Sequence, residues 1–350
     1  MYALRPKRYT IVNRENGTLT YDDCFLLLSF QLYQNKIPMP TSWSLSSLPP
    51  HDWFICLDID NYFDHEHNPE AIFEEGFTRP IPVGDRDIVA TIFFNGDPEQ
   101  PEFHIESPED LSKHEVEQAN QTLARILGTN LDLRPLYDQA SSDPVLEPKL
   151  TEFYGLKRMA RATLLEDITN RIIQMQLSHK PTARKMAWKV REAYGTHLVH
   201  GGKTLPAWPR PFQLSKADPA QIRKMGPTLR KGEYLVGLAQ DILAGEVDLD
   251  YLDREASPEE FYEKISEVRG IGPTSAQDLM LFRDTTKAFF PSNKKKGEEK
   301  RLRKWIILSY GGDPANTSDK EFSEMIQSWK GYNAAAIEFL FVNWIVSQKK

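Results

Sequence analysis

A short glycine-rich turn between two helical segments constrains the fold most, in the run Glu267–Ala276 (EVRGIGPTSA). One helix is predicted to end at Val268, Gly270 and Gly272 form the turn, and Pro273 opens the next helix. Glycine lets the backbone adopt positive φ and approach a ligand closely. The amides at the start of the second helix then suit a phosphate group. An ordinary tight connection between two helices is the alternative interpretation of the same pattern.

The segments around this turn divide the chain into a strand-rich part and a helical part. Runs rich in β-branched and aromatic residues predict strands at Tyr9–Val12, Trp53–Leu57, Asp87–Phe94 and Phe103–Ile105, with a helix at Tyr21–Gln34 lying on the sheet. From Ser112 onward the apolar spacing is helical. Helices are predicted over residues 116–127, 164–177, 180–194, 218–224, 231–243, 258–268, 273–283, 300–310, 318–329 and 332–346.

The predicted fold class is therefore α+β. An N-terminal domain with an antiparallel sheet, residues 1–110, is followed by an all-α domain, residues 111–350, whose hairpin covers residues 258–284. A chain of 350 residues is long enough for two such domains, each with its own core.

Charge is divided unevenly between the two parts. Residues 1–150 hold 11 Lys and Arg against 25 Asp and Glu, whereas residues 151–350 hold 32 against 25. The net charge of −7 therefore conceals a basic second part, which favours a polyanionic partner for that part alone. An acidic domain beside a mildly basic one, without electrostatic purpose, is the alternative.

Composition excludes several classes of protein. The longest apolar stretches, Phe25–Phe30 and Ala334–Val346, are too short or too interrupted to cross a bilayer, and the N-terminus has no secretory-type apolar run. The two cysteines, Cys24 and Cys56, cannot form a disulfide framework and are expected to be buried. We expect a cytoplasmic monomer without a cofactor. No metal is expected, because the histidines lack ligand spacing on a regular element.

The hairpin and several other segments resemble the helix-hairpin-helix DNA glycosylases, and most closely the bacterial 3-methyladenine DNA glycosylase II group. The resemblance runs in order from about residue 85 to the end of the chain. The segments that carry it are Arg125–Tyr137, Asp143–Leu146, Gly155–Arg158, Ile172–Ser178, Asp218–Leu235, the hairpin and Trp329–Ala336. It implies an all-α glycosylase domain behind a small α+β domain, and double-stranded DNA with a modified base as the partner.

The resemblance also implies how a base would be exposed. An enzyme that acts on a base in a duplex must first extrude it, and a side chain fills the gap. The matching position here is Gln176, whose amide could wedge into the duplex and hydrogen-bond the orphaned base. A solvated glutamine at a helix end is the alternative.

Both positions at which the family carries its catalytic groups are occupied differently in this chain. The family has an aspartate in a Pro-x-Asp context after the hairpin, and bifunctional members add a lysine on the second hairpin helix. Asn293 and Thr274 occupy these positions, 19 residues apart. Without the lysine, a Schiff-base lyase mechanism is not expected. Asn293 carries no charge, but its amide could cap a helix, hold a phosphate or position a water.

Asp278 is the second departure from the family and the alternative candidate for the catalytic carboxylate. It lies one helical turn beyond Thr274, on the helix face that lines the base pocket in the family. There it could accept a hydrogen bond from the base or offset positive charge on the sugar. The alternative is that Asp278 faces solvent or pairs with Arg283.

Two further features fit the resemblance. Phe341 lies where related enzymes stack an aromatic ring on the extruded base, although a core aromatic is the alternative. Lys294, Lys295 and Lys296 follow Asn293 and could contact DNA phosphates together with Gly270, Gly272 and Thr274. A solvated surface loop is the alternative for the lysines.

The hypothesis is a monofunctional DNA glycosylase that flips a modified base out of the duplex and hydrolyses its glycosidic bond. The base would be an alkylated purine, or an unusual or bulky one such as a phage hypermodified base, which would imply a defence role. A non-catalytic DNA- or lesion-binding protein on the same fold is the alternative.

Overall fold

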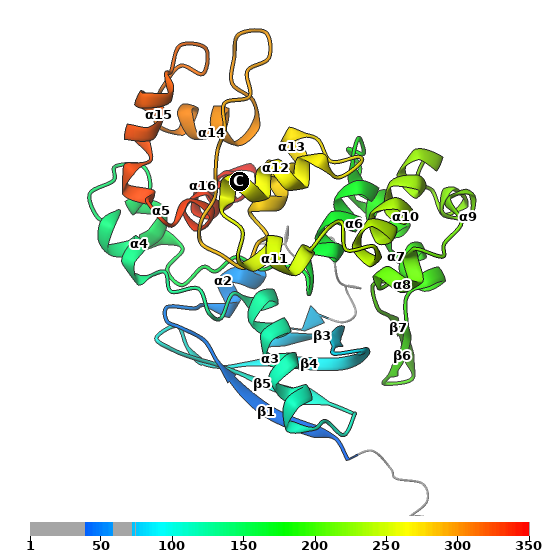
Figure 1. The fold of residues 1–350 in the computed structure, drawn as a ribbon. Helices are drawn as coiled ribbons and strands as arrows, with labels where there is room; N and C mark the ends of the chain where they lie inside the picture. The colour runs from blue at the N-terminus through cyan, green and yellow to red at the C-terminus, as the bar shows by residue number, and fades with distance from the viewer. Residues whose placement is uncertain (1–38, 59–71, 74, 350) are drawn as a thin grey trace, which may run out of the picture.

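The computed structural model describes residues 39–58, 72–73 and 75–349. A five-stranded antiparallel sheet is followed along the chain by helices that lie against it and extend away from it (Figure 1). The predicted α+β fold class is confirmed. The predicted strand at Tyr9–Val12, the helix at Tyr21–Gln34 and Cys24 lie outside the described residues. Within the described ranges, no helix is both long and apolar enough to span a membrane.

The sheet has the strand order β1-β5-β4-β3-β2. Its strands are β1 (Thr41–Ser46), β2 (Ile72–Phe73), β3 (Gly76–Val83), β4 (Arg86–Asp97) and β5 (Gln100–Ser107). Ile92 of the central strand β4 pairs with Phe77 of β3 and with Ile105 of β5, and all three side chains are fully buried. Pro80 and Pro82 lie in β3 beyond its short pairing with β2, where a missing amide is tolerated at an edge.

Helix α3 (Lys113–Leu127) covers one face of this sheet (Figure 1). It begins at a capping box in which Ser112 and Glu115 satisfy each other's backbone amides. It ends at Gly128, whose φ of 67° is the left-handed conformation that favours glycine at this position, as the sequence predicted. The Trp43 indole of β1 donates to Asn120 at 2.7 Å and thereby ties the helix to the sheet.

The predicted strand at Trp53–Leu57 is wrong, because this segment forms the short helix α2 (Trp53–Asp58). The Asp52 carboxylate accepts hydrogen bonds from the amides of Phe54 and Ile55 at 2.9 and 3.2 Å, which starts a helical turn. Trp53 and Cys56, three residues apart, are fully buried, whereas Phe54 is exposed. Cys56 is thus buried as expected, and burial raises the pKa of its thiol to about 12.

Every helix predicted from residue 164 onward is present, with its ends within four residues of the predicted bounds. Its helices are α4 (Arg134–Gln139), α5 (Glu147–Glu152), α6 (Leu164–Gln174), α7 (Lys180–Tyr194), α8 (Pro211–Leu214), α9 (Pro219–Lys224), α10 (Leu229–Leu243), α11 (Leu249–Arg254), α12 (Pro258–Glu267), α13 (Pro273–Met280), α14 (Arg301–Ser309), α15 (Asp319–Met325) and α16 (Asn333–Lys349). Helix α6 ends three residues earlier than predicted, and α13 also ends three residues earlier. Helix α15 ends four residues earlier than predicted. Helices α4, α5, α8 and α11 and a two-stranded hairpin, β6 (His197–His200) and β7 (Lys203–Pro206), were not predicted.

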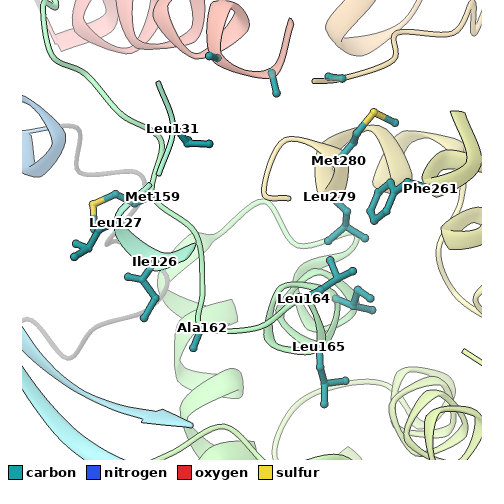
Figure 2. Packing of buried hydrophobic residues seen from close by; sticks show 14 of the residues in the cluster. Ile126, Leu127, Leu131, Met159, Ala162, Leu164, Leu165, Phe261, Leu279 and Met280 are labelled. Carbon is teal, nitrogen blue, oxygen red and sulfur yellow. The ribbon is translucent and has the colours of Figure 1, made fainter. Parts of the chain in front are cut away.

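Apolar side chains join the hairpin to the helices beneath it. Figure 2 shows Leu279 of α13 next to Leu164 of α6, with Phe261 of α12 beside Leu279. All three side chains are buried. Burying a leucine or phenylalanine side chain contributes about 1.5–3 kcal/mol. The hairpin is therefore held in place by its own apolar face against α6.

A buried ionic cluster lies beside this apolar core. Arg125 of α3 contacts Asp253 of α11 at 2.6 Å and Asp167 of α6 at 2.9 Å, and Arg161 contacts Asp167 at 2.9 Å. Arg125 also donates to the carbonyl of Phe282, immediately beyond α13, at 3.1 Å. A single guanidinium thus connects α3, α6, α11 and the end of the hairpin.

Glu338 of α16 yields a testable prediction about stability. Burial raises the pKa of its carboxyl to about 8. Because the carboxyl holds its proton more tightly in the folded protein than in the unfolded chain, protonated Glu338 contributes fully to the free energy of unfolding below about pH 4.5. This contribution is lost as the pH rises through 8. We expect Glu338→Gln to raise the free energy of unfolding at pH 9 by on the order of 3 to 5 kcal/mol. Urea unfolding at pH 5, 7 and 9 measures this, and a variant less stable at every pH would contradict it.

Candidate nucleic-acid interface and active site

The hairpin between α12 and α13 has the geometry that the sequence predicted. Gly270 has a φ of 92°, and a Cβ atom on it would lie 2.3 Å from Cδ2 of Tyr234. Gly272 has a φ of −101° and caps α13, and a Cβ there would meet no atom within 4 Å. Gly270 is therefore required by the fold itself. The space beside Gly272 is open, which leaves room for a ligand to approach the backbone.

The turn after α6 exposes Gln176. Its φ is 62°, a left-handed conformation that a residue with a side chain seldom adopts. The side chain is exposed, as is that of the following Leu177. A non-glycine residue in this conformation stores strain, which is typical of functional positions. The geometry is compatible with the predicted duplex wedge, which stays a prediction.

Asp278 is bound by two arginines from different helices. Arg171 of α6 approaches Asp278 Oδ2 at 2.5 Å, and Arg301 of α14 contacts the same oxygen. Arg171 also donates to the Ser275 hydroxyl at 3.1 Å. The Asp278 side chain is 16% exposed and that of Arg301 46%. The structure therefore brings a partly buried carboxylate and two guanidiniums together on the face of α13 that the sequence pointed to.

The alternative pairing of Asp278 with Arg283 is wrong. The Arg283 guanidinium is buried beneath the hairpin, where it donates to the Ala256 carbonyl at 2.6 Å and lies 4.7 Å from the ring centre of Phe261. Neither arginine partner of Asp278 was found from the sequence, because Arg171 and Arg301 come from segments far from it along the chain. Burial and the like charge of Arg301 lower the pKa of the Arg171 guanidinium, and Asp278 opposes this effect.

Asn293 lies at the start of a loop that is organised by another carboxylate, Glu299. The Glu299 side chain is fully buried. It accepts hydrogen bonds from the backbone N–H of Asn293 at 2.8 Å and from the Ser292 hydroxyl at 2.5 Å. It also contacts Arg303 at 3.3 Å. Sequence reasoning missed Glu299, although it stands just before α14. Between Asn293 and Glu299, the side chains of Lys294, Lys295 and Lys296 are exposed.

Phe341 and Thr274 are both partly exposed. Phe341 of α16 is 37% exposed, and its ring meets Trp305 of α14 edge-on with the ring centres 5.6 Å apart. Trp305 lies one helical turn beyond Arg301, so α14 links the aromatic pair to the carboxylate site. Thr274 lies one turn before Asp278 on α13. Within the described ranges, no group of three or more His, Cys, Asp or Glu could hold a metal ion.

The fold of this chain, a sheet followed by helices that include the glycine hairpin, is similar to the folds of solved DNA glycosylases. The 3-methyladenine DNA glycosylase of Archaeoglobus fulgidus superimposes with a TM-score of 0.67 at 21% identity, over 86% of this chain and 97% of that protein. The 8-oxoguanine glycosylase/lyase of Clostridium acetobutylicum, in complex with double-stranded DNA containing cytosine opposite 8-oxoG, has a TM-score of 0.61 at 16% identity, over 89% and 99%.

A DNA glycosylase is also similar to this chain in sequence. The DNA-3-methyladenine glycosylase of Bacillus subtilis (strain 168) is 25% identical over 150 residues, which cover 43% of this chain and 49% of that protein. The match thus spans about half the length of this relative. No protein-family model matches the chain. The resemblance predicted from the motifs is confirmed by these relatives.

The two hairpin glycines form a matched pair for a test. Gly270→Ala is expected to lower the free energy of unfolding by at least about 1–2 kcal/mol, because of its positive φ and the close Tyr234 ring. Gly272→Ala is expected to leave stability unchanged but to weaken duplex binding, because the new methyl group fills the open space. Thermal melts and fluorescence anisotropy with a labelled duplex measure both effects. Unaltered DNA affinity in Gly272→Ala would remove this turn from the interface.

Proposed function

We propose that the protein is a monofunctional DNA N-glycosylase, which flips a modified base out of double-stranded DNA and hydrolyses its glycosidic bond. The observation that carries the proposal is the contact of the Asp278 carboxylate with both Arg171 and Arg301. Asp278 lies on α13, the second helix of the hairpin. The exposed Gln176 lies five residues beyond Arg171, so one short segment carries both a site residue and the proposed wedge. The fold shared with DNA glycosylases and the sequence match over 150 residues support the same function.

The two signs of charge at this site suit the two halves of the reaction. Cleavage of an N-glycosidic bond leaves positive charge on the sugar and transfers an electron pair to the departing base. An ionised carboxylate stabilises the sugar, and guanidinium donors stabilise the base. The Asp278 carboxylate and the guanidiniums of Arg171 and Arg301 are in direct contact, so both kinds of group are available at one place. Thr274, one turn away, and Phe341 would line the pocket, and hydrolysis needs no lysine nucleophile at Thr274.

The lysine loop and the hairpin would bind the DNA backbone. Lys294, Lys295 and Lys296 are exposed on one loop and would contact phosphates without reading sequence. The open amide end of α13 at Gly272 offers a second phosphate position. Asn293 has no charge and is joined through its backbone to Glu299, so its part is to shape the loop.

Three variants, at Asp278, Asn293 and Glu299, test which carboxylate is required for base release. With duplexes that carry single modified bases, Asp278→Asn is expected to reduce base release by roughly 10²-fold or more. Asn293→Ala is expected to keep most of the activity, because it removes no charge. Glu299→Gln retains an oxygen that can accept from Ser292, and Glu299 is too buried to reach a substrate, so kcat is expected to change little.

The outcome of these assays also separates the alternatives. Loss of release with Glu299→Gln but not with Asp278→Asn, in folded variants, would move the catalytic role to Glu299. Tight binding to a damaged duplex without release of any base across a broad panel would establish a lesion-binding protein instead of an enzyme.

The charge of the site predicts the class of base. Arg171, Arg301 and Asp278 together carry a net positive charge, which disfavours a cationic base such as 3-methyladenine or 7-methylguanine. We therefore expect faster release of uncharged modified bases, such as 1,N6-ethenoadenine or a bulky hypermodified pyrimidine. Single-turnover release rates from duplexes of matched sequence measure this preference, and faster release of the cationic bases would contradict it. Release of a hypermodified phage base would indicate defence, and release of a damaged base would indicate repair.

A further inference from the structure

The end of helix α6 is held by a side chain from another helix. Helix α6 ends at Gln174, and the left-handed Gln176 follows two residues later. The ammonium of Lys231 donates to the Ile173 carbonyl at 2.8 Å and to the Met175 carbonyl at 2.5 Å. These two carbonyls belong to the last turn of α6 and its cap, where a helix leaves acceptors without internal partners. A lysine at this position satisfies them and also complements the negative end of the helix dipole.

Lys231 is placed there by its own helix. It lies in the first turn of α10, whose start is fixed by Thr228, since the Thr228 hydroxyl accepts from the Lys231 amide at 3.3 Å. The Lys231 residue is 8% exposed, which is unusual for a lysine. A buried ammonium is costly unless it is hydrogen-bonded, so its two carbonyl partners fix its location.

The same helix also contacts the hairpin. Tyr234 lies three residues beyond Lys231 on α10, and its ring lies against Gly270. One face of α10 therefore touches both elements that are expected to meet DNA, namely the end of α6 and the α12–α13 turn. Helix α10 thus contacts α6 near the Gln176 turn through Lys231 and contacts the α12–α13 turn through Tyr234. Figure 1 shows α10 beside α6.

We propose that Lys231 is a positioning residue that holds the end of α6, so that Gln176 projects into the DNA duplex. This inference rests on the proposed function, because it requires that Gln176 acts as the wedge. An apolar side chain could fill the same volume, but it could not donate hydrogen bonds to the carbonyls of Ile173 and Met175. Lys231 therefore acts through Gln176, without contacting DNA itself.

A double-mutant cycle tests this coupling. The variants are Lys231→Met, Gln176→Ala and the double variant, and Lys231→Arg is the conservative replacement that keeps the charge and donors. The measurement is the fluorescence of 2-aminopurine placed beside a modified base, which rises when the neighbouring base is unstacked. Lys113→Met, an exposed lysine at the start of α3, serves as the control for loss of one charge.

Lys231→Met is expected to reduce the fluorescence rise by roughly fivefold or more, Lys231→Arg is expected to restore part of it, and the double variant is expected to match Gln176→Ala alone. Duplex affinity and its salt dependence are expected to stay near those of the wild type, because no phosphate contact is lost. A Lys231→Met protein that behaves like the wild type, or effects that add in the double variant, would overturn the inference.

Amide hydrogen exchange in the free protein separates this inference from the proposed function. If Lys231 holds the turn, the amides of residues 175–178 exchange faster in Lys231→Met and regain protection in Lys231→Arg. Faster exchange without any fluorescence rise in the wild-type protein would support the anchoring by Lys231 and refute the wedge role of Gln176. Unchanged exchange would overturn the anchoring itself.

Discussion

The buried guanidinium of Arg125 is the interaction on which the arrangement of the helices depends. It joins helix α3, which covers the sheet, to Asp167 on α6, to Asp253 on α11 and to the carbonyl of Phe282, beyond α13. All three charged side chains are almost fully buried. Removing one partner from such a group leaves a buried charge without a counter-charge, which is strongly destabilising. Replacing the whole group by apolar side chains would cost far less. The sheet, helix α6 and the hairpin therefore keep one relative position.

This rigidity explains how a site can be built from distant segments. Asp278, Arg171 and Arg301 come from three helices, and each helix is held by contacts outside the site. Helix α6 is held in its first turn by Asp167 and at its end by Lys231, whereas α13 is held by the apolar contact with α6. Because these supports are buried, the site residues themselves can remain partly exposed and available to a ligand.

Local signals made much of the fold predictable. Ser257 and Pro258 mark the start of α12, Pro273 marks the start of α13, and Gly128 ends α3, since capping depends on a few neighbouring residues. The segment Trp53–Leu57 was misread because its aromatic and β-branched residues outweighed the Asp52 cap. In such a short segment, the apolar residues alone cannot distinguish a strand from a helical turn.

The composition of the site was predictable only in part. Asp278 was singled out by its position on the hairpin helix, but its partners depend on packing between distant segments, which no local pattern encodes. For the same reason Glu299 was missed, although its sequence position beside α14 could have drawn notice. Lys231 gave no sequence signal at all, because a lysine in the first turn of a helix is normally a surface residue.

The contacts of Glu299 have a consequence for how this chain could change length. Glu299 accepts hydrogen bonds from the Ser292 hydroxyl and the backbone N–H of Asn293, and thereby closes the base of the loop. The two ends of the loop that contains the lysines therefore lie close together. Lengthening a closed loop adds little entropic cost, about 0.6 kcal/mol for each doubling. Insertions and deletions among the lysines are therefore accommodated without moving α14. If the protein binds DNA as proposed, this segment is a point at which the affinity for DNA could change while the neighbouring helices stay in place.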